Sequence, residues 1–324
     1  MGWFAARPLV LALALALDLL LGDPRYRLHP VRLLGDAIAA GERVLRRTPL
    51  PERIAGAVLA LEIVVLAAGV ALAGSLAAWR LGGPLAGVIA DGILVYFAFA
   101  GRALADEGRA IASCLAEDDV PAARAAVAGV VGRDTAELDE PQIARAAIET
   151  LGENSVDALI APAFWALLLG PAGAWLHKAA STLDSMVGYR TERFERFGTA
   201  GARLDDVLVW VPARLALALV TLAAAVARLD ARAAWATGLR DRLKHASPNS
   251  AHGEAAFAGA LHVALGGTLS YAGVETTRPV IGGEFPAPRR AELSSAVRLL
   301  LVTEALMLAT SAAVALGVFA ALPR

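Results

Sequence analysis

The chain contains a single cysteine, only two lysines and few charged residues. Cys114 alone can form neither an intrachain disulfide nor a cysteine zinc cluster, and we interpret it as a small buried hydrophobe. Charged residues make up 19% of the 324 positions and the net charge is −1, which gives no electrostatic case for nucleic-acid binding. The sequence also lacks a GxxxxGK[ST] phosphate loop, an HExxH string, a GxGxxG turn followed by a helix and an EF-hand loop. A nucleotide would therefore be held by an unfamiliar arrangement of side chains.

What the chain has instead is a series of long apolar runs. Hydrophobic residues make up 57% of it, whereas soluble proteins hold about half. The apolar segments lie at about 8–22, 54–79, 84–101, 158–176, 207–227 and 299–322. A membrane-spanning helix needs roughly 20 such residues. We predict an all-α fold, a polytopic helical membrane protein with a single integral membrane domain over 1–324 and a polar helical loop at 102–157.

The turn Leu81-Gly82-Gly83-Pro84 separates two of these segments, and we predict that they form a transmembrane hairpin. Each arm carries one acid, Glu62 in the first and Asp91 in the second. Because a carboxyl group facing lipid is costly, both are expected to face the interior of the helix bundle. Hydrogen bonding between helices is a better explanation for these two acids than catalysis.

Segment 158–176 contains Gly170-Pro171, which divides it into halves of about a dozen residues. Such a break is expected of a re-entrant hairpin, which enters and leaves the membrane on the same side. As one continuous helix the segment would instead cross the membrane. We predict the hairpin, because it keeps Glu153 and Lys178 on one side.

The distribution of basic residues supports that choice. They concentrate in four stretches, 25–53, 102–145, 178–203 and 228–298. The positive-inside rule favours the cytoplasmic side for all four. At least one of the segments 158–176 and 207–227 must then be re-entrant or interfacial. Strictly, both must be, unless segment 255–274 also enters the membrane. We therefore expect a multi-pass protein of the inner (cytoplasmic) membrane with cytoplasmic helical loops and its active site facing the cytoplasm.

Polar residues crowd both ends of segment 158–176. Glu149, Glu153 and Asp157 fall at i, i+4 and i+8, which places them on one face of a continuous helix. Like charges in a row repel, so a metal ion or a basic side chain should bind there, although a solvated acidic face fits the spacing equally well. Lys178 ends the apolar segment, where a lysine often only extends its ammonium group to the membrane surface. The polar residues around Lys178 favour a functional role over that of an anchor.

Three other candidates have structural alternatives. Asn154 lies between two acids, where it could act as a helix cap. Ser247-Pro248-Asn249-Ser250 could form a turn and cap ahead of the helix that contains Glu254. His29-Pro30 is typical of a turn after a membrane helix.

Several strings together resemble the adenosylcobinamide-phosphate synthase family of cobalamin biosynthesis. They are Asp18-Leu19-Leu20-Leu21-Gly22-Asp23-Pro24 with His29-Pro30-Val31, Gly132-Arg133-Asp134-Thr135, Glu153-Asn154-Ser155-Val156-Asp157, the stretch 178–189, Asp205-Asp206, and Ser247-Pro248-Asn249-Ser250 followed by 254–261. They run in the family's order through nearly the whole chain, and they are specific jointly rather than singly. One departure is Ser250-Ala251-His252-Gly253, where the family pattern has Ala-Gly-Trp-Pro; it leaves the role of this loop open.

The resemblance implies an integral membrane enzyme that joins adenosylcobyric acid to an aminopropanol, or to its O-phosphate, through an amide bond. ATP would drive the reaction with Mg²⁺. The expected partners are the corrinoid substrate, the aminopropanol (phosphate), membrane lipid and other cobalamin-assembly enzymes, with no nucleic acid.

Under this reading, each polar residue receives an expected role. We expect catalysis by Glu153, Asn154, Lys178 and Asp184, and Mg²⁺ binding by Glu153, Asp157 and Asp184. Substrate binding is expected of His29, Arg32, Ser185, Tyr189, Arg190, Arg193, Asn249 and Glu254. Acids would hold the metal, cations would offset phosphate charge, and a base would deprotonate the incoming ammonium group.

Two other classes of function remain open. A membrane sensor on the same scaffold would lack catalysis, and loss of the strings around Lys178 and Asp184 would mark it; both are intact. A transporter would use Glu62, Asp91 and Arg214 along a pathway. The polar clusters, however, lie at the expected membrane edges rather than at the midplane.

Overall fold

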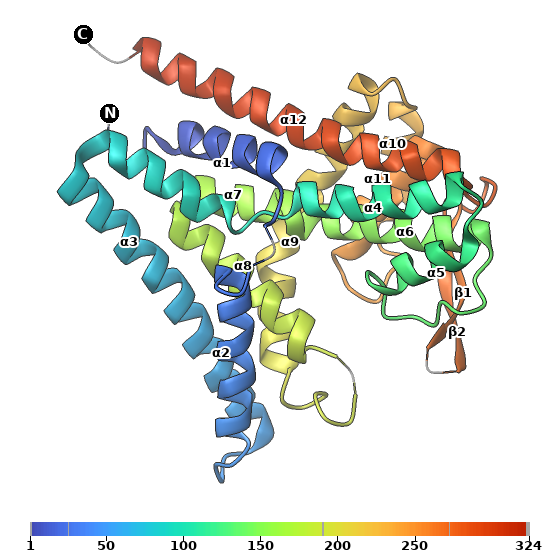
Figure 1. Cartoon of the computed structure of the whole chain (residues 1–324), viewed down its shortest axis with the longest axis horizontal. Helices are drawn as coiled ribbons and strands as arrows, with labels where there is room; N and C mark the ends of the chain where they lie inside the picture. Colours follow the sequence, from blue (N-terminus) through green and yellow to red (C-terminus); the bar gives the residue numbers. More distant parts are fainter. Residues whose placement is uncertain (1, 25, 190, 272, 322–324) are drawn as a thin grey trace. The chain divides into compact units, whose positions relative to one another are not determined.

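The computed structural model describes residues 2–24, 26–189, 191–271 and 273–321 (Figure 1). Contacts within the chain divide it into two compact units. Unit 1 comprises Met1–Ala100, Ala161–Val209 and Met307–Arg324, and unit 2 comprises Gly101–Ile160 and Trp210–Leu306. The expected single integral membrane domain stays a prediction.

Unit 1 is built from α-helices. They are α1 (Arg7–Leu21), α2 (Pro30–Leu45), α3 (Glu52–Tyr96), α7 (Ala161–Leu169), α8 (Pro171–Val187), the start of α9 (Thr199–Val226) and the end of α12 (Arg290–Ala321). Its core lies where α2, α3 and α8 meet, with Leu59, Leu183 and Phe197 almost fully buried. Gly56 is required there, because a Cβ atom at this position would lie 1.7 Å from the carbonyl oxygen of Phe197.

Helix α3 is a hairpin of two helical arms that meet at Gly83, whose φ is +73°. The indole Nε1 of Trp79 donates to Asp91 Oδ2 across the turn at 2.9 Å, so the second arm folds back on the first. Trp3 Nε1 donates to the same carboxylate oxygen at 3.2 Å. The predicted hairpin and the buried position of Asp91 are confirmed. The prediction for Glu62 is wrong, because its side chain is exposed.

The predicted break at Gly170-Pro171 is confirmed. Gly170 has φ +68° and ends α7, and Pro171 begins α8. A Cβ atom at Gly173 would lie 2.2 Å from the carbonyl oxygen of Trp165, so α8 packs closely against α7. Whether this pair of helices re-enters the membrane stays a prediction.

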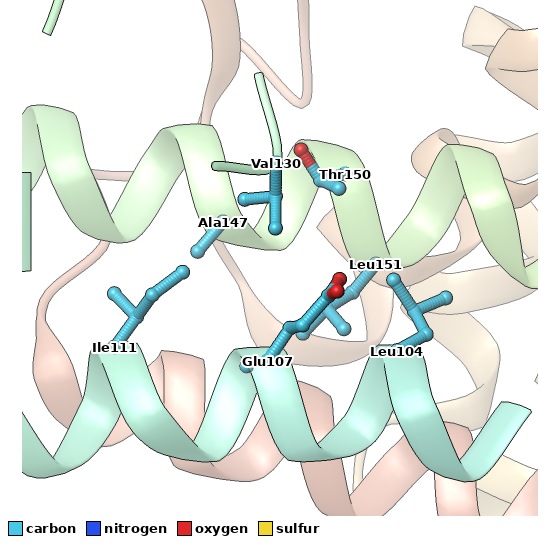
Figure 2. Close-up of a pocket in the computed structure, with 8 residues that line it drawn as sticks. Leu104, Glu107, Ile111, Val130, Ala147, Thr150 and Leu151 are labelled. Atoms are coloured by element: carbon cyan, nitrogen blue, oxygen red, sulfur yellow. The ribbon is translucent and has the colours of Figure 1, made fainter. Parts of the chain in front are cut away.

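Unit 2 holds the polar segment predicted at 102–157. Its elements are α4 (Gly101–Ala116), α5 (Val120–Ala128), α6 (Glu140–Ser155), a π-helical turn (Val156–Ile160), α10 (Ala231–Asp241), α11 (Ser250–Leu261), strands β1 (Leu265–Tyr271) and β2 (Val274–Ile281), and the remaining parts of α9 and α12. Figure 2 shows α4 beside α6, with Leu104 and Ile111 of α4 opposite Ala147 and Leu151 of α6. The predicted helical loop at 102–157 thus consists of three α-helices.

The antiparallel pair β1 and β2 was not predicted. Segment 255–274, interpreted as one apolar run able to enter the membrane, contains most of α11 and the whole of β1. Gly266 and Gly267 have φ values of +84° and +86°, and the strand register shifts between Leu265 and Gly267. Glycine tolerates this backbone and few other residues do, so these two glycines end the apolar helix pattern.

Three helical stretches are long and apolar enough to span a membrane, within the part of the chain that the structure describes. They are Glu52–Ala116, Thr199–Val226 and Arg290–Ala321. They contain the predicted segments 54–79 and 84–101, and nearly all of 207–227 and 299–322. The predicted class, a helical protein with several membrane-spanning segments, is confirmed.

Candidate functional site

Glu149 is the buried acid of a polar cluster in unit 2. Arg133 pairs with its Oε2, and the side chains are 7% and 5% exposed, respectively. The backbone N–H of Gly266 donates to Oε1 at 2.6 Å. A buried carboxylate without such partners would be strongly destabilising. Glu149 therefore joins the loop before α6 to the start of β1.

Glu254 of α11 is a second buried acid. Its side chain is 4% exposed, and Oε2 has no hydrogen-bond partner among the described residues. Burial raises the pKa of Glu254 well above its usual value, and the negative charges of Glu149 and Glu153 raise this pKa further. The Glu254 carboxyl group therefore holds a proton more tightly than an exposed glutamate does.

Two glycines bring Glu254 against α6. A Cβ atom at Gly152 would lie 2.9 Å from Glu254 Cα, and one at Gly253 would lie 2.3 Å from the carbonyl oxygen of Gly152. No other residue type fits at either contact without movement of the helices. The approach of α11 to α6 is thus what places Glu254 near Glu149 and Glu153.

The remaining acids of this region lie where α6 ends. Glu153 is half-buried and Asn154 is exposed. Asp157 follows in the π-helical turn, which has more residues per turn than an α-helix. The single face expected for Glu149, Glu153 and Asp157 assumed a continuous α-helix, and the π turn interrupts it before Asp157.

A histidine and an arginine complete the cluster. Burial lowers the pKa of His245, and the charge of Glu153 partly opposes this shift. Nη1 of Arg278, in β2, lies 3.4 Å from His245 Nε2. Nη2 of the same arginine donates to the Tyr271 hydroxyl at 2.7 Å. Both acids and arginines thus act electrostatically on Glu254.

Asn249 precedes α11 and is buried. It occupies the N-cap position, but its side chain makes no capping hydrogen bond. Instead Asn249 Oδ1 accepts from Arg214 Nη1 at 3.3 Å. The guanidinium group of Arg214 also lies over the Trp210 ring, 3.9 Å from its centroid.

The candidates on and after α8 belong to unit 1. Lys178 and Asp184 are half-buried, whereas Ser185 and Tyr189 are exposed. Ser185 Oγ donates to the carbonyl oxygen of Ser181 at 2.9 Å. Arg190 lies outside the described residues.

The candidates near α2 also belong to unit 1, and two of them are engaged in structural contacts. His29 is buried, and its Nε2 lies 2.8 Å from Asp23 Oδ1. Arg193 Nη2 lies 2.9 Å from Glu42 Oε1. Burial alone would raise the pKa of Glu42, but hydrogen bonds from Arg46 and Arg193 hold it below its usual value. Arg32 is exposed.

The structure thus gathers part of the expected set. Glu153 and Glu254 act on each other electrostatically within unit 2, where Asn249 also lies. Asp184 belongs to unit 1, whereas Glu153 and Asp157 belong to unit 2. Among the described residues, no three His, Cys, Asp or Glu side chains lie close enough together to hold a metal ion. The shared Mg²⁺ site therefore stays a prediction.

Sequence reasoning did not single out Arg133, His245 or Arg278 as members of a site. Arg133 stands in the string Gly132-Arg133-Asp134-Thr135, which was a usable signal. His245 and Arg278 had none, because they depend on a β-hairpin that the apolar pattern concealed.

Helices long and apolar enough to span a membrane, together with buried acids and a buried arginine in unit 2, define a helical membrane protein that carries a cluster of buried charged groups. The chain belongs to the family described as CobD/Cbib protein, whose model matches residues 11–300. No solved structure matches it significantly.

Curated relatives cover nearly the whole chain. The cobalamin biosynthesis protein CobD of Pelobacter propionicus is 44% identical over 308 residues, 95% of each chain. CobD of Geobacter metallireducens is 43% identical, over 94% of this chain and 95% of its own. The cobalamin biosynthesis protein CbiB of Salmonella typhi is 39% identical, over 92% and 94%.

Proposed function

We propose that this chain is an ATP-dependent carboxylate–amine ligase of cobalamin biosynthesis. It joins aminopropanol, or its O-phosphate, to adenosylcobyric acid and forms adenosylcobinamide or its phosphate. The observation that carries the proposal is the family match over residues 11–300. Relatives at 38–44% identity are named as cobalamin biosynthesis proteins.

The cluster in unit 2 has the groups that amide formation needs. The incoming amine is an ammonium ion at neutral pH and must lose a proton before its nitrogen can attack a carboxyl carbon. Glu254 is the proposed acceptor of that proton, because burial and the neighbouring acids raise the pKa of its carboxyl group well above the usual value. Arg278 and Arg133 add positive charge near the acids.

The donor chemistry also fits Mg²⁺ and ATP. Mg²⁺ prefers oxygen ligands and commonly takes only one or two protein carboxylates, completing its shell with phosphate oxygens and water. Glu153 and Asp157 would supply such carboxylates, and neither is fully buried. When bound, the metal would offset the negative charge of the ATP phosphates. In unit 1, Lys178 is proposed as a cation for phosphate.

The test is amide formation in membranes that contain the full-length protein. Adenosylcobyric acid, ATP, Mg²⁺ and either aminopropanol or its O-phosphate are supplied. Mass spectrometry should show the corrinoid gaining the mass of the amine minus one water, and only when ATP is present. Membranes without the protein are the control. An unchanged corrinoid with both amines, from protein shown to be folded, would overturn the proposal.

A further inference from the structure

A polar cavity of about 380 Å³ lies in unit 2 between the loop before α6, helix α6 itself and the β-hairpin. Its size falls within the range of small-molecule sites. The backbone N–H of Asp134 donates to the carbonyl oxygen of Ser270 at 2.8 Å. Asp134 Oδ2 in turn accepts from Ser270 Oγ at 2.5 Å and from Gly273 N at 2.8 Å. These bonds fix one wall of the cavity to the hairpin.

Arg145 is the unmatched cation of this cavity. Its side chain is half-buried, and its Nε is buried without a hydrogen-bond partner. Among the described residues, no carboxylate lies within ion-pair distance of it, whereas the other lining arginine, Arg133, is neutralised by Glu149. A buried guanidinium nitrogen without a partner is destabilising. An anion in the cavity would relieve that cost.

Other lining groups indicate which anion. The amide oxygen of Gln142 accepts from the backbone of Asp139 at 2.9 Å, which leaves its amide nitrogen as a donor. The Thr268 hydroxyl also lines the cavity. Together with the N–H groups of the Arg145 guanidinium, they form a set of hydrogen-bond donors that converge on one ligand group. A phosphate with three terminal oxygens can accept more of these hydrogen bonds than a carboxylate can.

The cavity also carries unmatched negative charge. Glu137 and Glu275 line it, both are exposed, and within the described part of the chain neither forms an ion pair. A ligand that carries a phosphate and an ammonium group would match Arg145 and these two acids together. A nucleotide without a metal ion would match only Arg145.

We infer that this cavity binds the phosphorylated amine substrate, with Arg145 on its phosphate and Glu137 and Glu275 attracting its ammonium group. The identity of the amine rests on the proposed function. Arg145 and Glu149 are one turn apart on α6, so the cavity adjoins the buried cluster that contains Glu254.

The test uses purified full-length protein in detergent and measures binding of four separate probes. They are aminopropanol O-phosphate, aminopropanol, inorganic phosphate and ATP. Wild-type protein should bind the first most tightly of the three non-nucleotide probes. Arg145→Gln should weaken the binding of aminopropanol O-phosphate about tenfold or more, because a charge-assisted hydrogen bond is lost. Arg109→Gln, which removes an exposed arginine of α4 in the same unit, should leave it unchanged.

The acids have a different signature. The double variant Glu137→Gln, Glu275→Gln should weaken the binding of aminopropanol O-phosphate but not the binding of inorganic phosphate. Arg145→Gln should keep the thermal stability of the ligand-free protein, because it removes a charge that has no partner there. If it unfolds instead, Arg145→Lys serves as the binding variant and should lose most of the affinity gained from the planar fork.

Three outcomes would overturn the inference. They are no binding of aminopropanol O-phosphate by the wild type, equal binding by the Arg145 variant, or a loss confined to ATP, which would indicate a nucleotide site. These outcomes are separable from failure of the proposed function. Binding that depends on Arg145 without amide formation would leave the cavity assignment standing and reject the ligase.

Discussion

At the scale of single residues, the two lysines of the chain have separate environments. Lys244 Nζ lies 2.9 Å from the buried Asp241 and donates to the Val280 carbonyl oxygen at 3.0 Å. These contacts hold the end of α10 against β2, so Lys244 has a structural role. Lys178 is half-buried on α8 and is the lysine that remains for phosphate chemistry.

Lys178→Ala should abolish amide formation while the protein still accumulates in membranes, because the phosphate charge loses its cation. Lys178→Arg separates this role from that of a surface anchor. Arginine reaches the membrane surface as well as lysine does, but it cannot replace a compact ammonium group at a defined site. Initial rates at saturating substrates, normalised to protein amount, give the measurement. Near-normal activity of Lys178→Ala would leave Lys178 as an anchor.

Glu254 leads to a prediction about pH. Its pKa is raised in the folded protein by burial and by Glu149 and Glu153. The folded state therefore binds a proton more tightly than the unfolded state, and stability falls as pH rises above the unfolded value of about 4.3. Glu254→Gln keeps the shape of the side chain and removes this pH-dependent loss of stability. The variant should melt higher than wild type at pH 8, by roughly 2–4 °C for each kcal/mol gained.

The difference in melting temperature should shrink as the pH falls toward about 4.3, where both forms carry a neutral side chain. Glu254→Gln should also lose amide formation if Glu254 accepts the proton of the amine. Thermal unfolding of detergent-solubilised protein across this pH range provides the measurement. A variant that melts lower than wild type at pH 8 would contradict the buried, proton-holding state of Glu254.

At the scale of elements, glycines set the approach of α11 to α6. In an ordinary helix position, Gly→Ala stabilises by about 0.5–1 kcal/mol. Gly152→Ala should do the opposite, because the new Cβ would lie 2.9 Å from Glu254 Cα. We expect a lower melting temperature together with lost activity. Gly69→Ala is the matched control, since nothing lies within 4 Å of a Cβ at that position. Equal behaviour of the two variants would reject the close contact.

Elements also show what the sequence could predict. The breaks at Gly83 and Gly170 were readable, because glycine next to proline inside an apolar run rarely continues a helix. The β-hairpin was not, because β1 continues the apolar pattern of α11 and only Gly266-Gly267 marks the change. The π-helical turn likewise has no recognisable signal in the sequence. The part of the site that depends on either element, Arg278 and the position of Asp157, could not be placed from spacing alone.

At the scale of the whole molecule, membrane topology depends on α7 and α8. Both flanking stretches, 102–145 and 178–203, are rich in basic residues. The positive-inside rule favours the cytoplasm for each. α7 has nine residues, too few to span a bilayer that needs roughly 20, and Gly170 separates it from α8. A hairpin that re-enters on the cytoplasmic side satisfies both constraints.

We expect positions 154 and 192 to face the same side of the membrane. Asn154→Cys and Glu192→Cys, each introduced singly into a Cys114→Ala background, place one thiol before and one after the α7–α8 pair. Both native side chains are exposed, so both thiols should be accessible. A membrane-impermeant maleimide should label neither in intact cells with a sealed inner membrane and both in inside-out vesicles. A cysteine at a known periplasmic site of another membrane protein controls for sealing. Labelling of the two positions from opposite sides would mean that 158–176 crosses the membrane once, and the re-entrant hairpin would be wrong.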